Sequence, residues 1–432
     1  MSNTDLALCF LLVVLYTVIA VRLDRLSITM PLVVVLTSAL IGSYALGLVD
    51  IPLTTVDTES LTEITLALLL FADASTLDFS KVRDDARLVG RLLLIGFPLT
   101  VVFGGLAAYT LFPQQQIGFA LLLGAILAPT DAALGLPIFN NPRVPVRIRR
   151  ALNVESGLND GIATPLVALF IALTVSEVGS VPGDWLRSAL SQIGLAVVAG
   201  TAIGLAGGTL FRSAVQKGWT SKTAQQFGNL ALALAAFWGS LSIGGNGFIS
   251  AFVAGIVFGY ATRNTLHEAT EFTETSGTLL SMFVWAIFGA NLVIPLLLNF
   301  NPLAFVFALL SLTAVRMVAV AIALIGAHMR VDTVLMMGWL GPRGLASVVF
   351  MLIANEALHE AGVETSTLLA MASWTILLSV VLHALSAIPL ANWYARRLET
   401  AGSHAPELVD VAELPARRRR LLSHLSIGPG ER

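Results

Sequence analysis

The chain has 432 residues, of which 56% are hydrophobic and only 12% charged, and its mean hydropathy is +0.83. Soluble domains carry about twice that charged fraction, so the composition excludes an ordinary soluble protein. The formal net charge is −2, and we expect no nucleic-acid partner. The single cysteine, Cys9, lies within an apolar run, which excludes disulfides and cysteine metal sites within one chain.

Apolar runs recur along the whole chain and are long enough to cross a hydrocarbon core roughly 30 Å thick. The alternation that marks a membrane β-barrel is absent from them. We therefore predict an all-α polytopic membrane protein with about thirteen transmembrane helices within residues 1–395. The runs lie near residues 6–21, 30–48, 60–78, 88–112, 117–137, 154–176, 188–211, 227–244, 246–262, 277–298, 302–327, 333–355 and 368–394.

The first run is predicted to be a retained helix rather than a signal peptide. Its leader, MSNTD, has no Lys or Arg, whereas Arg22 and Arg25 follow it. Most of the 25 Lys and Arg fall in alternate loops, which predicts an N-terminus outside and a C-terminus in the cytoplasm of a plasma (inner) membrane protein. Residues 396–432 are expected to form a short, disordered or surface-lying cytoplasmic tail, whose Arg417–Arg420 cluster can touch anionic lipid.

Six charged residues remain inside or near the predicted spans. An ionised side chain at membrane depth costs about 2.5 to 3.5 kcal/mol and is tolerated where it pairs or faces a polar cavity. Six of them therefore indicate a polar interior. They are Asp73, Asp131, Glu155, Asp160, Arg316 and Arg343.

In the polar stretch NVESGLNDG of the sixth span, two carboxylates point in different directions from the helix axis. At about 100° per residue, Glu155 and Asn159 share one stripe of a helix, and Ser156 and Asp160 share a second. Glu155 and Asp160 then point about 140° apart. This favours two roles, one carboxylate facing an ion path and the other facing a neighbouring helix that could supply an Arg.

Two spans carry helix breakers at matching depth. The fifth contains LAPTDAALGLP with Pro129, Thr130 and Asp131, and the twelfth contains GWLGPRGLAS with Pro342 and Arg343. Proline removes a backbone donor and clashes with the preceding turn, so both helices should break there. Spans five and twelve run in opposite directions, which predicts two inverted six-helix repeats joined by the seventh span.

These motifs resemble the NhaP-type monovalent cation/proton antiporters, a sodium/proton exchanger family. The resemblance rests on APTDAALG, NVESGLNDG, the Arg of LTAVRMVAV, GPRGLASVV and GGNGFISAFVAGIVFG, with LLFADAS similar to an acidic third-span motif. It covers nearly all of the membrane region. It implies a secondary transporter exchanging Na⁺ or Li⁺ for H⁺ by alternating access, a homodimer with a transport bundle and dimerisation helices, and no cofactor besides the transported ions.

The resemblance also implies roles for single residues. Asp160 would be the main cation and proton carboxylate, with Na⁺ ligands from Asp160, Asp131, Ser156 and Thr130, and with Asp73 nearby. Asn159 would replace the second Asp of the electrogenic branch, which favours electroneutral one-for-one exchange. Glu155 would pair with Arg316 as a structural bridge, and Arg343 would support the broken twelfth helix. Asp73 departs from the Glu of some members, and its shorter side chain would need a water to reach the site.

Other functions fit the same residues less well or stay open as alternatives. K⁺/H⁺ or mixed Na⁺/K⁺ antiport stays open, and a cation channel is less favoured because it needs no paired helix breaks. An enzyme is not expected, since Ser156 lacks the preceding Gly of a nucleophile elbow and a spaced His. No His or Cys lies beside the six charged residues in the sequence. The glycines of the seventh span fit either a contact surface between helices of two chains or close packing within one.

Overall fold

The structure is a computed structural model that describes residues 3–26, 28–51, 53, 56–77, 86–131, 134–135, 138, 141, 143–178, 185–263, 265–399 and 407. Regular structure in these residues is helical, apart from one isolated β-bridge between Gly42 and Val49. The α-helices are α1 Asn3–Arg25, α2 Met30–Ile41, α3 Val56–Ser75, α5 Ala86–Arg91, α6 Phe97–Leu111, α7 Ile117–Ile126, α9 Val146–Val178, α10 Trp185–Gln216, α11 Lys222–Leu241, α12 Gly247–Thr262, α13 His267–Phe288, α14 Ile294–Leu298, α15 Pro302–Leu310, α16 Arg316–Ala323, α17 Val331–Trp339, α18 Leu345–Glu360 and α19 Ser366–Glu399.

Seven helices of the described part are long and apolar enough to cross a membrane: Asn3–Leu23, Ala86–Leu111, Val146–Glu177, Trp185–Gln216, Glu268–Leu298, Pro302–Ala323 and Ser366–Leu398. Three shorter apolar helices are Met30–Ile41, Ile117–Ile126 and Gly247–Thr262. The prediction of an all-helical polytopic membrane protein is thereby confirmed. The exact number of spans and their inverted relation stay predictions.

Three of the long helices contain a π-helical turn. The turns Leu92–Gly96 and Gly289–Val293 each lie just before a proline, Pro98 or Pro295. Proline has no N–H to give to the preceding turn, and a local widening accommodates the loss. The third turn, Ser311–Val315, directly precedes the buried Arg316.

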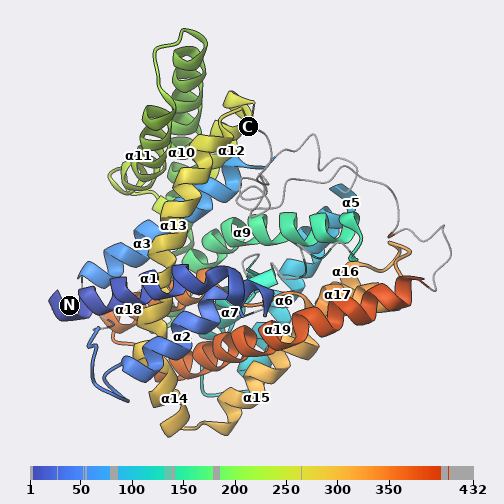
Figure 1. Ribbon diagram of the computed structural model, residues 1–432. Coiled ribbons are helices and arrows are strands. Elements are labelled where there is room, and N and C mark those ends of the chain that lie inside the picture. The colour runs from blue at the N-terminus through green and yellow to red at the C-terminus, as the bar shows by residue number, and fades with distance from the viewer. Residues whose placement is uncertain are drawn as a thin grey trace.

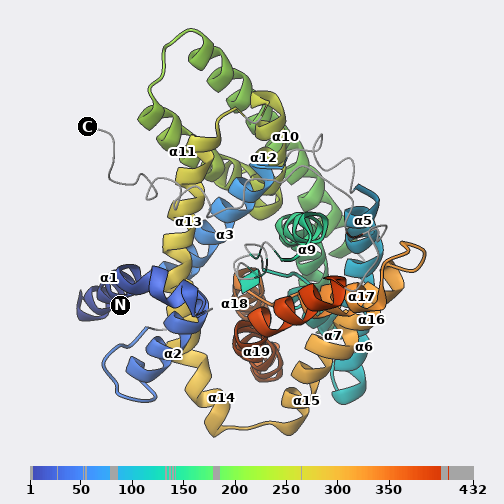
Figure 2. The same cartoon turned by 45° about the vertical axis from the view of Figure 1, so that its right-hand side comes forward.

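The helices contact one another in two groups (Figures 1 and 2). In the first, α3 packs against α12 and α13, and α10 and α11 pack against α12. In the second, α6 packs on α7, α7 on α9, α15 on α19 and α16 on α17. Helix α9 contacts α3, α10 and α12 as well as α7 and α18, so it lies where the groups meet.

The glycines of α10 pack within the chain. A Cβ at Gly200 would come 2.5 Å from the Ser250 carbonyl oxygen, and one at Gly204 would come 2.6 Å from that of Ala254. Small residues of this kind let two helix backbones approach closely. Close packing of α10 on α12 therefore accounts for these two glycines.

Several helices extend beyond the apolar runs that predicted them. Helix α9 begins at Val146 and α13 at His267, eight and ten residues before the predicted spans. Their first turns are polar, and a helix is not required to end where apolar composition ends. Helix α19 continues to Glu399, so residues 396–399 of the predicted tail are helical.

One further tail residue is buried. Glu407 is fully buried, and its Oε1 accepts hydrogen bonds from the Arg330 N–H at 2.8 Å and the Thr333 hydroxyl at 2.9 Å. A carboxylate at this position caps the start of α17. At Glu407 the tail is therefore packed rather than solvated. The Arg417–Arg420 cluster lies outside the described residues.

Candidate ion-binding site at the crossing of two broken helices

Two interrupted helices cross at the centre of the second helix group. Helix α7 ends at Ile126 and non-helical chain follows through Asp131, while α17 ends at Trp339 and α18 begins at Leu345. The breaks hydrogen-bond directly, since the Asp131 N–H donates to the Pro342 carbonyl at 2.8 Å. The Leu345 N–H donates to Asp131 Oδ2 at 3.0 Å, so the Asp131 carboxylate caps α18.

The crossing of the two breaks depends on glycine as well as on proline. A Cβ at Gly344 would lie 1.9 Å from Asp131 Oδ2, and one at Gly341 would lie 2.7 Å from Arg316 Nε. Real Cβ atoms do not approach other heavy atoms so closely. Glycine at these two positions therefore lets the second break pass beside the first.

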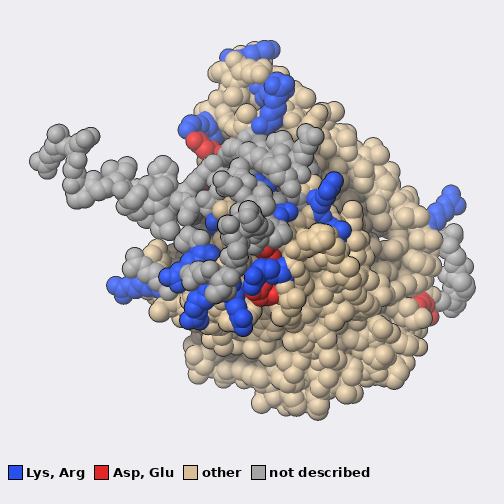
Figure 3. Space-filling model, turned by 90° about the vertical axis from the view of Figure 1, so that its right-hand side faces the viewer, with Lys and Arg blue, Asp and Glu red and all other residues tan. Residues whose placement is uncertain are grey.

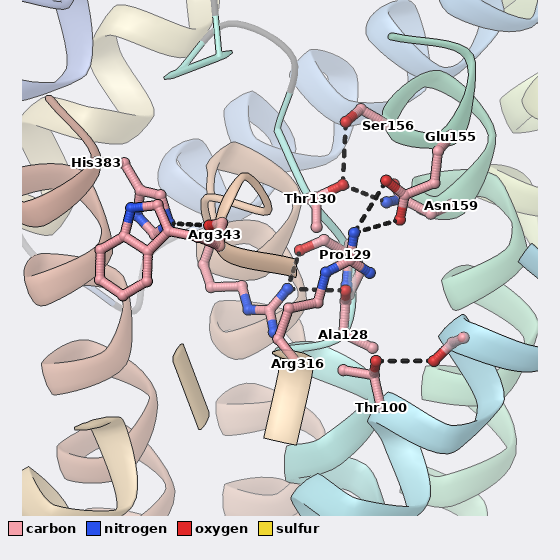
Figure 4. Close-up of polar contacts among 12 residues, drawn as sticks. Thr100, Ala128, Pro129, Thr130, Glu155, Ser156, Asn159, Arg316, Arg343 and His383 are labelled. Carbon is pink, nitrogen blue, oxygen red and sulfur yellow. Dashed lines mark hydrogen bonds and ion pairs between the residues drawn. The ribbon is translucent and has the colours of Figure 1, made fainter. Parts of the chain in front are cut away.

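Arg343 braces the first break rather than its own helix (Figure 4). Its side chain is fully buried, and Nη1 donates to the carbonyls of Ala128 at 3.1 Å and Pro129 at 3.4 Å. Ser347, in the first turn of α18, donates to the Ile126 carbonyl at 2.7 Å. The resemblance suggested that Arg343 supports the twelfth span; the carbonyls it meets belong to the fifth.

Three neutral polar side chains form a connected set beside the first break. Asn159 Nδ2 donates to Thr130 Oγ1 at 2.6 Å, and Thr130 Oγ1 lies 3.0 Å from Ser156 Oγ (Figure 4). All three residues are buried. The Asn159 Oδ1 has no hydrogen-bond partner among the described residues, so a buried acceptor remains at the site.

Glu155 and Arg316 form a buried ion pair. Arg316 Nη2 lies 2.8 Å from Glu155 Oε1 and 3.0 Å from Oε2, and both side chains are at most 1% exposed. The pair joins α9 to α16, which are 161 residues apart in sequence. Each charge compensates the other, as a buried charge requires.

The three remaining carboxylates come from three different segments. Asp160 lies on α9, next to Asn159, and is partly buried, as is Asp131 in the first break. Asp73 is partly buried on α3, a helix that contacts α9. Next to Asp160, Gly161 packs so tightly on Phe252 of α12 that a Cβ would come 2.2 Å from the ring. Thus an apolar ring from the first helix group packs beside Asp160.

Two residues of α19 hold the second break, a contact that the sequence did not predict. The Arg343 N–H donates to Ser379 Oγ at 2.6 Å, and Ser379 Oγ lies 3.2 Å from His383 Nδ1. His383 Nε2 lies 2.8 Å from the Trp339 carbonyl oxygen, and Nδ1 also lies 2.9 Å from the Ser379 carbonyl oxygen, so the imidazole joins α19 to the end of α17. Although no His is near Arg343 in sequence, this one lies beside it in space. A lone Ser and His in an apolar helix carry no sequence signal of that contact.

The donor set suits a hard monovalent cation. Carboxylate, hydroxyl and amide oxygens are the ligands that such ions prefer. No group of three or more His, Cys, Asp or Glu in the described residues is placed to hold a metal ion. The proposed Na⁺ ligands, Asp160, Asp131, Ser156 and Thr130, combine two carboxylates with two hydroxyls and do not require such a group.

Broken helices that cross around carboxylates are the construction of a secondary transporter. Comparison with known sequences identifies the kind of transporter: the family described as "Sodium/hydrogen exchanger, transmembrane" matches residues 10–393. The chain belongs to the sodium/hydrogen exchanger family.

Similar proteins include antiporters named for different cations. The chain is 29% identical to the Na(+)/H(+) antiporter NhaP of Pseudomonas aeruginosa, covering 75% of this chain and 78% of that one. It is 25% identical to the K(+)/H(+) antiporter NhaP of Alkalimonas amylolytica, covering 80% of this chain and 58% of that one. The fold is similar to that of the sodium proton antiporter MjNhaP1 of Methanocaldococcus jannaschii, with TM-score 0.74, 22% identity, and coverage of 90% and 98%.

Proposed function

We propose that the protein exchanges Na⁺ or Li⁺ for H⁺ across the plasma membrane by alternating access. The observation that carries the proposal is the crossing of the two breaks, where Thr130 hydrogen-bonds with Ser156 and Asn159. Asp131 follows Thr130 in the first break, and Asp160 follows Asn159 on α9. K⁺/H⁺ or mixed exchange is the second candidate, because one similar protein is named a K(+)/H(+) antiporter. A cation channel is the less favoured alternative, since it needs neither crossed breaks nor a shared proton.

Competition at Asp160 is the simplest mechanism. Its carboxylate binds either a proton or a cation, and the occupied site is carried across the membrane. Thr130, Ser156 and the free Oδ1 of Asn159 offer further oxygen atoms to the cation. Glu155 and Arg316 fix α9 against α16, and Arg343 fixes the first break, so these three residues position the site without taking up the ion.

The proposed topology has thirteen spans in two inverted six-helix repeats. The breaks in α7 and α17–α18 support it, because they interrupt the fifth and twelfth spans. An N-terminus outside and a C-terminus inside rest on the alternate loops that carry most of the Lys and Arg. On the face that Figure 3 shows, these residues lie mainly towards the top and the left, and the lower part consists of other residues. Cytoplasmic loops are enriched in Lys and Arg.

The two helix groups supply the parts that alternating access needs. The breaks and α9 belong to one group, and α3 with α10–α13 to the other. Movement of the second helix group, which contains the breaks and α9, along the first would expose Asp160 to each side of the membrane in turn. The resemblance also implies a homodimer, whose interface we leave as a prediction, because exposed apolar side chains on membrane helices face lipid as well as partners.

Exchange is proposed to be one for one. Asn159 is neutral where the electrogenic branch has a second Asp, so a single carboxylate, Asp160, would exchange one cation for one proton. The ion pair of Glu155 and Arg316 carries no net charge through the cycle.

Proteoliposomes with an imposed pH gradient and a pH-sensitive dye test the function. Addition of Na⁺, Li⁺ or K⁺ should drive proton efflux in the wild type, and Asp160→Asn should abolish it. Glu268→Gln is a matched control, because it removes an exposed carboxylate that pairs with Lys222 far from the site. Absence of proton movement with every cation would overturn the antiporter proposal, and the order of responses would decide between Na⁺ and K⁺.

A further inference from the structure

Helix α19 carries a stripe of three polar residues that the proposed mechanism does not use. Ser379, His383 and Ser386 occupy positions i, i+4 and i+7, so they lie on one face of the helix. Ser379 and His383 are buried, and Ser386 is half-buried. In Figure 4, His383 lies on one side of the two breaks, and Ser156 and Asn159 lie on the other. The stripe therefore approaches the breaks from the side opposite to Ser156 and Asn159.

Two members of the stripe hold the residue at which α17 ends. His383 Nε2 lies 2.8 Å from the Trp339 carbonyl oxygen, and the imidazole stacks on the indole with 5.2 Å between ring centroids and 27° between ring planes. The indole Nε1–H donates to Ser386 Oγ at 2.9 Å. Both the backbone and the side chain of Trp339 are thus fixed on α19.

Ser379 holds the other side of the same break. Its Oγ accepts from the Arg343 N–H at 2.6 Å, so the Arg343 backbone is fixed on α19 as well. From that backbone the guanidinium reaches the Ala128 carbonyl at 3.1 Å. Because Arg343 is fully buried, its N–H would lose its acceptor without this serine, and an unpaired buried donor is costly.

The second break in turn holds Asp131. The Pro342 carbonyl accepts from the Asp131 N–H at 2.8 Å, and the Leu345 N–H donates to Asp131 Oδ2 at 3.0 Å. Both partners lie within two residues of Arg343 in the chain. A displacement of the Arg343 backbone would therefore displace the carboxylate of Asp131, which is one of the proposed cation ligands.

The two other buried polar residues of α19 have different contacts. Thr375 donates to the Met371 carbonyl of its own helix at 2.8 Å, and Ser373 Oγ lies 3.6 Å from Met351 Sδ on α18. Neither of these bonds involves a residue of the two breaks. Each member of the stripe, by contrast, contacts Trp339 or Arg343.

We propose that Ser379, His383 and Ser386 are positioning residues for ion exchange, because they fix the second break on α19 and through it keep Asp131 in place for the cation. This role rests on the proposed antiport and deepens it. None of the three is among the proposed cation ligands, so loosening the stripe weakens cation binding without removing a ligand. Helix α19, the end of α17 and the start of α18 then move as one body during the cycle.

The KM for Na⁺ distinguishes positioning from mere stability. Ser379→Ala should raise the Na⁺ KM of proton efflux in proteoliposomes by roughly three- to tenfold at fixed pH, the factor expected for one lost hydrogen bond. A loss of folded protein would lower the maximal rate and leave the KM unchanged. Ser373→Ala is the matched control on the same helix and should keep the KM of the wild type.

A conservative substitution tests the imidazole. His383→Leu removes both ring contacts and should raise the Na⁺ KM, whereas His383→Gln keeps an amide N–H for the Trp339 carbonyl and should recover most of the wild-type KM. Ser386→Ala, at a half-buried position, is the milder variant and should give a smaller rise in the same direction. A wild-type KM in Ser379→Ala and His383→Leu, or an equal rise in Ser373→Ala, would overturn the positioning role.

Hydrogen–deuterium exchange tests the stripe without transport. In Ser379→Ala, peptides that contain residues 340–346 and 127–131 should exchange roughly three- to tenfold faster than in the wild type, whereas peptides of α10 should not change. If the wild type moves no protons, the antiport fails, and these exchange rates alone decide whether α19 holds the breaks. An active wild type whose exchange in these peptides is unaffected by Ser379→Ala would overturn the positioning role and leave the antiport standing.

Discussion

Glu155 and Asp160 are five residues apart on α9 but meet different surroundings. Glu155 is fully buried against the guanidinium of Arg316, whereas Asp160 is partly buried beside Asn159. The helical geometry of NVESGLND predicts this divergence, because the two side chains point about 140° apart. Glu155 is therefore neutralised by Arg316, and Asp160 is the carboxylate that we propose to exchange the proton and the cation.

The ion pair makes a prediction about stability. Arg316→Met leaves the Glu155 carboxylate buried without a partner, and we expect a loss of about 3 to 5 kcal/mol of unfolding free energy. Denaturation of the purified protein in detergent measures it. The double variant Glu155→Leu, Arg316→Met should recover most of the loss, because two apolar side chains remove the unpaired charge. A double variant as unstable as Arg316→Met would contradict a role for pairing.

At the scale of elements, the two breaks support each other. Asp131 caps α18 and bonds to the Pro342 carbonyl, while Arg343 binds the carbonyls at the end of α7. Ser379 in turn holds the Arg343 N–H from α19. Neither break has to be stable alone, since each supplies the partners that the other lacks.

The close crossing of the two breaks predicts that transport is sensitive to substitution of Gly344. Gly344→Ala would place a Cβ 1.9 Å from Asp131 Oδ2, so the carboxylate must move. Misplacement by about 1 Å can cost on the order of a hundredfold in rate, and we expect at least a tenfold loss of Na⁺-driven proton efflux. Gly90→Ala, with nothing within 4 Å of its Cβ, is the control and should transport normally. Equal activity of the two variants would contradict the packed crossing.

The elements also show where sequence reasoning reaches its limit. Pro129 and Pro342 mark the breaks because proline acts on its own helix, a local effect. That Arg343 braces the fifth span rather than the twelfth is not local, since the bond to Ala128 joins residues 215 apart. The positions of Ser379 and His383 likewise depend on packing of α19. The polar starts of α9 and α13 were missed because apolar runs mark burial in lipid, not helix ends.

At the scale of the whole molecule, the composition and the charge distribution predict a helical membrane protein, and the motifs predict its family. The arrangement of the helices in two contacting groups was not accessible from composition. It depends on close contacts such as those of Gly200 and Gly204 with α12, whose partners cannot be read from the glycines themselves.

The whole cycle makes an electrical prediction. With one proton exchanged for one monovalent cation, no net charge crosses the membrane, so the potential, worth about 2.3 kcal/mol per charge per 100 mV, does not drive turnover. Proteoliposomes on a solid-supported membrane should therefore show no sustained current after a Na⁺ jump. A steady current that depends on Na⁺ and pH would contradict one-for-one exchange.

Proton release on cation binding tests the central claim most directly. Purified protein in weakly buffered detergent solution would be titrated with NaCl, with choline chloride as the control salt, while the pH is followed. Competition at Asp160 predicts that Na⁺ releases up to one proton per chain and that Asp160→Asn releases none. Saturable Na⁺ binding without proton release, or equal release from Asp160→Asn, would contradict exchange at this carboxylate.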